Sequence, residues 1–140
     1  LIVGSRAAGE RVGATPVARV ASAAAAGVEP RVMGLGPVPA SKKALDRAGL
    51  SLADMDVIEI NEAFATQVLG CLKLMEVDQD DSRVNPNGGA IAVGHPLGAS
   101  GARLTLTAMR QLQRVQGRYA LVTLCIGVGQ GLAVVLERVS

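Results

Sequence analysis

The sequence contains almost no aromatic side chains. Among its 140 residues there is one Phe, one Tyr and no Trp, although hydrophobic residues make up 49% of the chain. The core must therefore be built from Ala, Val, Leu and Ile. A chain of this length suffices for one domain with a core of its own.

An excess of charge of either sign is also lacking. The chain has 14 basic and 12 acidic side chains, which leaves a formal net charge of +2, and no block of Lys or Arg. This balance argues against nucleic acid as the main partner, because nucleic-acid binding proteins carry a basic patch or stripe.

Cysteines and uninterrupted apolar runs are scarce as well. Cys71 and Cys125 are too few for a disulfide framework, and we expect a reducing compartment, the cytoplasm. The small-residue run at 20–27 lacks the leucine-rich centre of a secretory signal. The uncharged run at 119–136 is long enough to cross a membrane, but glycines interrupt it. We interpret it as two buried strands joined by a turn and expect no membrane span.

What is present is an alternation of strand and helix patterns. Strands are predicted at 17–26, 57–60, 118–126 and 132–139. A helical turn is predicted at 6–13. Helices are predicted at 40–48, from the segment 61–64 onward to about residue 75, and after residue 100. This order predicts an α/β layered fold, in which a mixed β-sheet is flanked by helices and ends in a β-hairpin. We expect residues 17–140 to form the domain and residues 1–16 to be a linker or remnant of a preceding domain, with 1–3 as the tail of a strand.

Short signals mark where several elements begin and end. The Gly-Leu-Gly-Pro-Val-Pro segment at 34–39 predicts a rigid turn before the 40–48 helix, and Gly49 is expected to stop that helix. Ser51-Leu-Ala-Asp54 has the form of a capping box. The segment 78–83 is expected to be a charged surface loop.

Apolar residues recur at steps of three and four along the helix that ends near 75. Phe64, Val68, Cys71, Leu72 and Met75 share one predicted face. A thiol on such a face is usually an inert core group, so we assign Cys71 a structural role.

The segment 85–101 is rich in Gly and Pro and holds the only histidine of the chain, His95. This composition predicts a loop, and the helical spacing that follows predicts that the loop leads into a helix whose first turn Ser100 caps. An imidazole held by a tight loop beside a helix start is placed to handle protons near a negative group. The alternative is a core or surface histidine without a chemical role.

Two further polar side chains lie where strands are expected to meet loops. Cys125 ends a strand just before a glycine-rich turn, whose amides are expected to lower the pKa of the thiol and let its proton exchange. Asn61 is either a helix cap or a group that orients a water and donates to an oxyanion. Cys125 has the alternative of an ordinary buried strand cysteine. The turn also fits a phosphate nest, although it lacks the Lys of a P-loop.

These segments resemble the signature blocks of the thiolases. The blocks are Asn-Glu-Ala-Phe at 61–64, the Gly-rich segment at 88–103 and Cys-Ile-Gly-Val-Gly-Gln-Gly at 125–131, and 34–39 is similar to a further block. The resemblance runs through the whole chain but matches only the C-terminal part of the family. It implies an acyltransferase that cleaves 3-ketoacyl-CoA with coenzyme A to acetyl-CoA and a shortened acyl-CoA, as in fatty acid β-oxidation, or runs the reverse condensation. Coenzyme A is then a substrate, and no further cofactor or metal is implied.

The resemblance also implies a role for each site residue. His95 is the base that activates a nucleophilic cysteine, and Cys125 is the acid/base cysteine that moves the proton at the α-carbon of the acetyl unit. Asn61 holds a water that, with His95, forms one oxyanion hole, and the backbone N–H of Gly127 contributes to the other. Phe64 lines the acyl or pantetheine path, although its helical spacing fits core packing equally well.

The chain departs from the thiolase pattern in one respect that bears on activity. The nucleophilic cysteine belongs to the N-terminal half of thiolases, and nothing in these residues replaces it. We therefore expect the chain alone to be inactive, with an N-terminal thiolase half as its partner in a homodimer or homotetramer. Val128 stands where the family often has Gly, a variant similar to thiolases for 3-oxoadipyl-CoA. The alternatives are a CoA-ester-binding module that breaks no bond, and a structural domain with vestigial loops.

Overall fold

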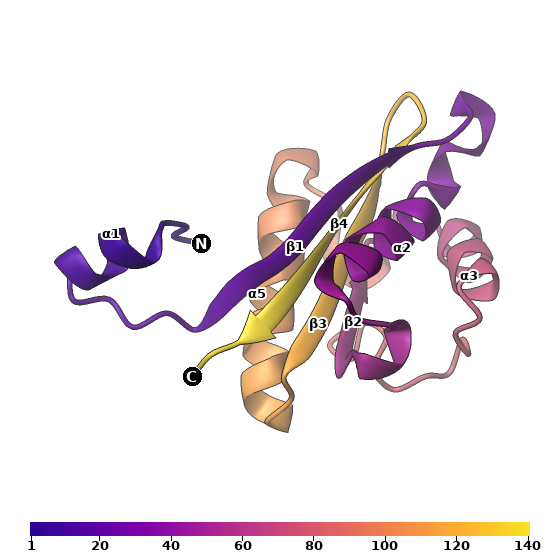
Figure 1. The fold of residues 1–140 in the computed structure, drawn as a ribbon. Helices are drawn as coiled ribbons and strands as arrows, with labels where there is room; N and C mark the ends of the chain where they lie inside the picture. Colours follow the sequence, from indigo (N-terminus) through magenta and orange to yellow (C-terminus); the bar gives the residue numbers. More distant parts are fainter.

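The computed structural model describes residues 1–140 and is organised around one mixed sheet with helices on both faces (Figure 1). Its strands are β1 (Ala18–Gly27), β2 (Val57–Ile60), β3 (Tyr119–Ile126) and β4 (Gln130–Arg138). The order across the sheet is β1-β4-β3-β2, in which β4 is antiparallel to both neighbours and β2 is parallel to β3. The predicted α/β layered fold and its terminal β-hairpin are confirmed.

Two long helices cover opposite faces of the sheet. The helices are α1 (Arg6–Arg11), α2 (Pro37–Ala48), α3 (Ala65–Leu74), α4 (Ala90–Val93) and α5 (Leu97–Val115), with 3-10 turns η1 (Pro30–Leu35) and η2 (Leu52–Asp54). Helix α2 packs on β1 and β4, and α5 packs on β2 and β3 (Figure 1). No helix has the length and apolarity needed to cross a bilayer.

The N-terminal segment lies apart from the sheet. Helix α1 buries none of its residues and stands away from the other elements in Figure 1. The helical turn expected at 6–13 is confirmed, whereas the strand expected at 1–3 is wrong, because these residues pair with no strand.

The start of α2 differs from expectation because two backbones meet there. The helix begins at Pro37, inside the segment predicted as a turn, since proline is well suited to a first helical position. Gly36 lies so close to Gly131 of β4 that a side chain on either residue would collide with the other backbone. The expected stop is confirmed, with Gly49 in the left-handed region at φ 67°. The capping box of Ser51 and Asp54 is also present.

The core consists of aliphatic residues on both faces of the sheet, as the composition predicts. Residues of β2 alternate between these faces: Val57 packs with the α5 side, whereas Ile58 packs with the α2 side. Helix α3 covers a third cluster, in which Cys71 is fully buried at 0% exposure. Burial raises the pKa of the Cys71 thiol, which fits the inert structural role expected for it.

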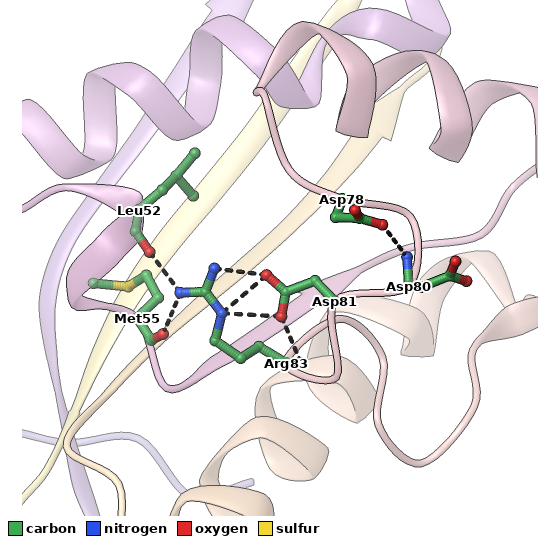
Figure 2. Close-up of polar contacts among 6 residues, drawn as sticks. All are labelled: Leu52, Met55, Asp78, Asp80, Asp81 and Arg83. Carbon is green, nitrogen blue, oxygen red and sulfur yellow. Dashed lines mark hydrogen bonds and ion pairs between the residues drawn. The ribbon is translucent and has the colours of Figure 1, made fainter.

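Arg83 ties the charged loop at 78–83 to the turn before β2 (Figure 2). Its Nη1 donates to the carbonyl oxygens of Leu52 and Met55 at 3.1 and 3.0 Å. Its Nε and Nη2 donate to the carboxylate of Asp81 at 2.7 to 3.1 Å, and these bonds lower the pKa of that carboxyl. The carbonyl of Arg83 accepts from the N–H of Ile58 at 2.8 Å. The loop is therefore fixed against β2 rather than free on the surface.

We predict that Arg83→Lys lowers the free energy of unfolding by about 1–3 kcal/mol, because an ammonium cannot reach two carbonyls and a carboxylate in one plane. Urea unfolding followed by circular dichroism measures the change. Arg6→Lys is the control, since the Arg6–Glu10 pair is exposed and its replacement is expected to leave the midpoint unchanged. Equal midpoints for Arg83→Lys and the unmodified chain would contradict the assigned role.

Candidate active site

The site lies at the edge of the sheet where β2 and β3 end. Because these strands are parallel, their carboxyl ends meet at one edge. The N–H of Asn61 donates to the carbonyl of Thr123 at 3.0 Å, so Asn61 continues β2 alongside β3. Cys125 lies two residues beyond Thr123 on the neighbouring strand, and neighbouring strands are about 5 Å apart. The structure therefore places Asn61 and Cys125 at the same edge.

His95 reaches this edge through a chain of hydrogen bonds. Its Nε2 lies 3.2 Å from Nδ2 of Asn61, and its Nδ1 lies 2.6 Å from Oγ of Ser100. The hydroxyl of Ser100 in turn donates to the carbonyl of Pro96 at 3.0 Å. The half-buried imidazole is thus held through both of its ring nitrogens.

The partners of the two ring nitrogens favour one position for the ring proton of His95. The hydroxyl hydrogen of Ser100 is used on Pro96, so its oxygen accepts from Nδ1–H of His95. An amide NH₂ only donates, so Nε2 of His95 must be the acceptor towards Asn61. The neutral ring therefore keeps its basic lone pair on Nε2, at the edge of the sheet.

The predicted role of Ser100 as a helix cap is wrong. Helix α5 begins at Leu97 with Pro96 as its N-cap residue, and no side chain caps it. Ser100 lies one turn further on, fully buried, and orients His95. The helical spacing showed that a helix follows the loop, but it did not show that the helix starts before Ser100.

Glu62 and Asn85 hold the loop that carries His95 against the end of β2. Asn85 accepts from the N–H of Ile60 and donates to its carbonyl, both at 2.9 Å, as a neighbouring strand would. Its Nδ2 also donates to Glu62 Oε1 at 2.8 Å. Glu62 Oε2 accepts from the N–H of Ile91 at 3.1 Å, in the first turn of α4. Gly89 leaves room for this carboxylate, because a Cβ at that position would overlap it.

Arg103 holds the other end of the same loop. Its Nη2 donates to the carbonyl of Gly94 at 2.8 Å, directly before His95. The pattern of residues did not single out Glu62, Asn85 or Arg103 individually. The sequence showed only that these residues lie in or next to the polar segments. It did not show which carbonyl or amide group each side chain binds.

Cys125 is half-buried, and no hydrogen bond joins it to His95 or Asn61. Burial raises the pKa of the Cys125 thiol, so the expected lowering by the turn amides is wrong. The reason is that desolvation of the thiolate outweighs the hydrogen bond of the residue's own backbone. The thiol is therefore protonated at neutral pH.

The turn after Cys125 presents a free donor. The N–H of Gly127 donates to no other group of the chain, and the residue is exposed. The carbonyl of Gly129 accepts from the N–H of Val28 at 2.8 Å, which fixes the turn against the segment before η1. Val128 takes the left-handed conformation at φ 69°, which is strained for a β-branched residue. The turn is thus held by contacts outside itself.

The segments that lead away from this edge of the sheet carry exposed apolar side chains. They come from the segment after β2, from the His95 loop and from the β3–β4 turn: Phe64, Ile91, Val93, Leu97, Ile126 and Val128. Phe64 is 64% exposed and precedes α3, so its alternative reading as a core residue of this helix is wrong. We call these six residues the apolar rim. Such a rim suits contact with an apolar ligand or another polypeptide.

Two surface hollows of the chain lie away from the rim. One is lined by residues of α2 and the turn after it, such as Leu45 and Leu52, and the other by Leu69 and Val77. No group of three or more His, Cys, Asp or Glu side chains is arranged to hold a metal ion.

Comparisons with known proteins show which protein family this chain is similar to. The family model described as "Thiolase, C-terminal domain" matches residues 14–138. The "3-oxoadipyl-CoA/3-oxo-5,6-dehydrosuberyl-CoA thiolase" of Escherichia coli K12 is 62% identical over 139 residues, and a "Beta-ketoadipyl-CoA thiolase" of Pseudomonas aeruginosa is 58% identical over 139 residues. Each alignment covers 99% of this chain and 35% of the relative.

A solved structure shows the same fold. Human mitochondrial 3-ketoacyl-CoA thiolase superposes with a TM-score of 0.93 at 47% identity, over 97% of this chain and 34% of that one. The chain therefore spans about a third of the length of these relatives.

We predict that the neutral imidazole of His95 carries its proton on Nδ1. Ring ¹⁵N shifts measured by NMR test this directly, because the chain has a single histidine. Ser100→Ala removes the acceptor, so we expect a larger Nε2–H population and a free energy of unfolding lower by about 1–3 kcal/mol. Thr105→Val is the matched control, since Thr105 makes the same type of bond to Gly101 on the same helix. A proton found on Nε2 in the unmodified chain would contradict the assignment.

Proposed function

The chain belongs to the thiolase family as its C-terminal domain, and from this we propose that it supplies the histidine base, the acid/base cysteine and the oxyanion donors of a thiolase-type acyltransferase. The observation that carries the proposal is the Ser100–His95–Asn61 chain, which leaves the basic Nε2 of His95 at the edge shared with Cys125. Hydrogen bonds of this kind are needed to orient a general base.

The proposed substrate is a 3-ketoacyl-CoA, and coenzyme A is the second substrate. The 62%- and 58%-identical relatives are named for 3-oxoadipyl-CoA and beta-ketoadipyl-CoA, which makes this our choice for the acyl group. The apolar rim supports contact with an acyl or pantetheine chain, in which Phe64 takes part. We place the reaction in the cytoplasm, in a homodimer or homotetramer, with residues 1–16 as a linker or remnant of a preceding domain.

The first half-reaction uses His95 and Cys125 in turn. Nε2 of His95 gives up the hydrogen bond from Nδ2 of Asn61 and takes the proton of a nucleophilic cysteine that lies outside these 140 residues. The thiolate then attacks the 3-keto carbon, and Nδ2 of Asn61 is free to donate to the oxyanion water. The C2–C3 bond then breaks, and its electron pair goes to C2 of the acetyl-CoA enolate. Cys125 gives its proton to C2, which releases acetyl-CoA and leaves a thioester on the nucleophile. The raised pKa of the Cys125 thiol supports this step, since the group enters it protonated.

The second half-reaction restores both groups. The Cys125 thiolate takes the proton of coenzyme A, whose sulfur attacks the thioester carbonyl. The bond to the nucleophilic cysteine breaks, the shortened acyl-CoA leaves, and the imidazolium of His95 returns its proton to the nucleophile. Negative charge on the carbonyl oxygens is met by the N–H of Gly127 and by a water that Asn61 holds beside His95. The free N–H of Gly127 supports its part in this role.

Neither cysteine of the chain is positioned to replace the nucleophile. Cys71 is buried under α3, with its thiol on the carbonyl of Gly34, and Cys125 makes no hydrogen bond with His95. We therefore expect the 140-residue chain to have no thiolysis activity by itself. A CoA-ester-binding module is the second candidate, since the free N–H and the apolar rim also suit binding without reaction.

A chimera tests the proposed function. This chain replaces the matching 35% of the 62%-identical Escherichia coli relative, whose remaining part supplies the nucleophile. We expect the chimera to cleave 3-oxoadipyl-CoA with coenzyme A, and His95→Ala to lower kcat by about 10²–10⁴-fold because the base is lost. Thr105→Val is the control that leaves turnover unchanged.

Two outcomes would overturn the proposal. A correctly folded chimera without activity would contradict the assigned roles, and turnover by the isolated chain would place the nucleophile within it. Calorimetry with acetyl-CoA separates the second candidate, since tight binding by the isolated chain together with an inactive chimera indicates a binding module.

A further inference from the structure

A carboxyl group is buried beside the site without any evident partner. Glu59 lies in β2 and is 1% exposed, and its Oε1 accepts no hydrogen bond. An apolar residue of similar size would fill this space without the cost of burying a charge. The buried carboxyl therefore needs an explanation other than packing.

A second unpartnered oxygen lies two residues further along the same strand. Oδ1 of Asn61 is buried and has no partner, while Nδ2 of the same amide meets His95. Val57 packs on the α5 side and Ile58 on the α2 side, so Glu59 and Asn61 both face α5. Residues two apart on one face of a strand are about 7 Å apart, which a glutamate side chain can bridge, alone or with one water.

The charges around Glu59 decide whether it holds a proton. Burial and, to a smaller extent, the charge of Glu62 raise the pKa of Glu59 to about 7, although the charge of Arg103 opposes this rise. Near neutral pH the carboxyl is thus protonated in a large part of the molecules. In that form it has an O–H to donate, whereas the carboxylate can only accept.

We propose that Glu59 is a positioning residue for Asn61: its protonated carboxyl donates a hydrogen bond, directly or through one water, to Oδ1 of Asn61 and so keeps Nδ2 on Nε2 of His95. A single proton gives both unpartnered oxygens a partner, because Oε1 of Glu59 carries it as the donor and Oδ1 of Asn61 accepts the hydrogen bond. The direction of the bond also selects the amide orientation, because Oδ1 turned towards His95 would face the lone pair of Nε2.

The dependence on pH follows from the direction of the titration. Below about pH 7 the carboxyl of Glu59 is protonated and donates to Asn61, and above about pH 7 it is ionised and the donor is lost. Two acceptor oxygens then face each other, and the amide of Asn61 is released from its fixed orientation. The His95–Asn61 contact is therefore expected to weaken as the pH rises.

The first test does not depend on enzymatic activity. The side-chain amide signals of Asn61, assigned by their loss in Asn61→Asp, are followed by NMR against pH in the 140-residue chain. We expect a midpoint near pH 7 in the unmodified chain that the ring ¹⁵N shifts of His95, which contacts the same amide, do not follow. We expect no such midpoint in Glu59→Gln, whose NH₂ donates at every pH, and displaced signals at every pH in Glu59→Met, which has no donor. Dispersed backbone amide spectra confirm that each variant is folded.

Two results would overturn the proposal. Amide signals of Asn61 that do not change with pH in the unmodified chain exclude coupling to Glu59. Signals of Glu59→Met that coincide with those of the unmodified chain at low pH show that no donor is needed.

The second test rests on the proposed function and uses the chimera. We expect Glu59→Gln to keep kcat and to remove the fall in activity above about pH 7. We expect Glu59→Met to lower kcat about tenfold with KM unchanged. A packing role alone predicts the opposite ranking, with Met at least as active as Gln and the same pH profile, and this outcome would overturn the proposal. If the unmodified chimera is inactive, the proposed function fails, and the NMR titration still decides the role of Glu59.

Discussion

The pairing of β2 on both of its edges is the constraint on which the rest of the structure depends. All residues of this short strand are buried, so each backbone N–H and C=O needs a partner within the chain. β3 serves one edge. On the other edge, the backbone around Arg83 and then the side chain of Asn85 take the place of a neighbouring strand. An asparagine side chain can replace backbone because its amide has the same donor and acceptor as a peptide unit.

The use of a side chain at that point has a structural consequence. A continued strand would cover the end of β2 with more backbone, whereas the pairing by Asn85 ends at Ile60, directly before Asn61. The side chain of Asn85 also binds Glu62, and Glu62 holds the first turn of α4. A short series of hydrogen bonds, from β2 through Asn85 and Glu62 to α4, therefore connects the sheet to the loop that carries His95. Rigid placement of this kind is what the proposed role of His95 as a base requires.

The sequence predicted the features that depend on local pattern. The four strands of the sheet, the helix stop at Gly49, the capping box at Ser51 and the terminal hairpin each depend on a few neighbouring residues, and each is confirmed. Of the polar points predicted in segments 61–64, 85–101 and 125–131, the structure brings Asn61 and His95 into contact. That these residues carry out the proposed chemistry stays a prediction.

The errors concern properties that non-local contacts decide. Ser100 had the residue type and spacing of a helix cap, but its hydroxyl is used by His95 and Pro96. Cys125 stands beside amides that would lower its pKa, but its burial depends on elements distant in the sequence. The same limit hid Glu59, since a strand reading Val-Ile-Glu-Ile does not show that its glutamate lies under a helix. These three cases have the same physical cause. The sequence pattern indicates which residues lie at the site, but the elements packed over these residues determine their protonation and orientation. Because that packing comes from β2, α4 and α5 of this chain alone, His95 and Asn61 are held in contact without any residue of a nucleophilic half. In the reaction that we propose, no substrate binding energy then has to be spent on arranging these two side chains.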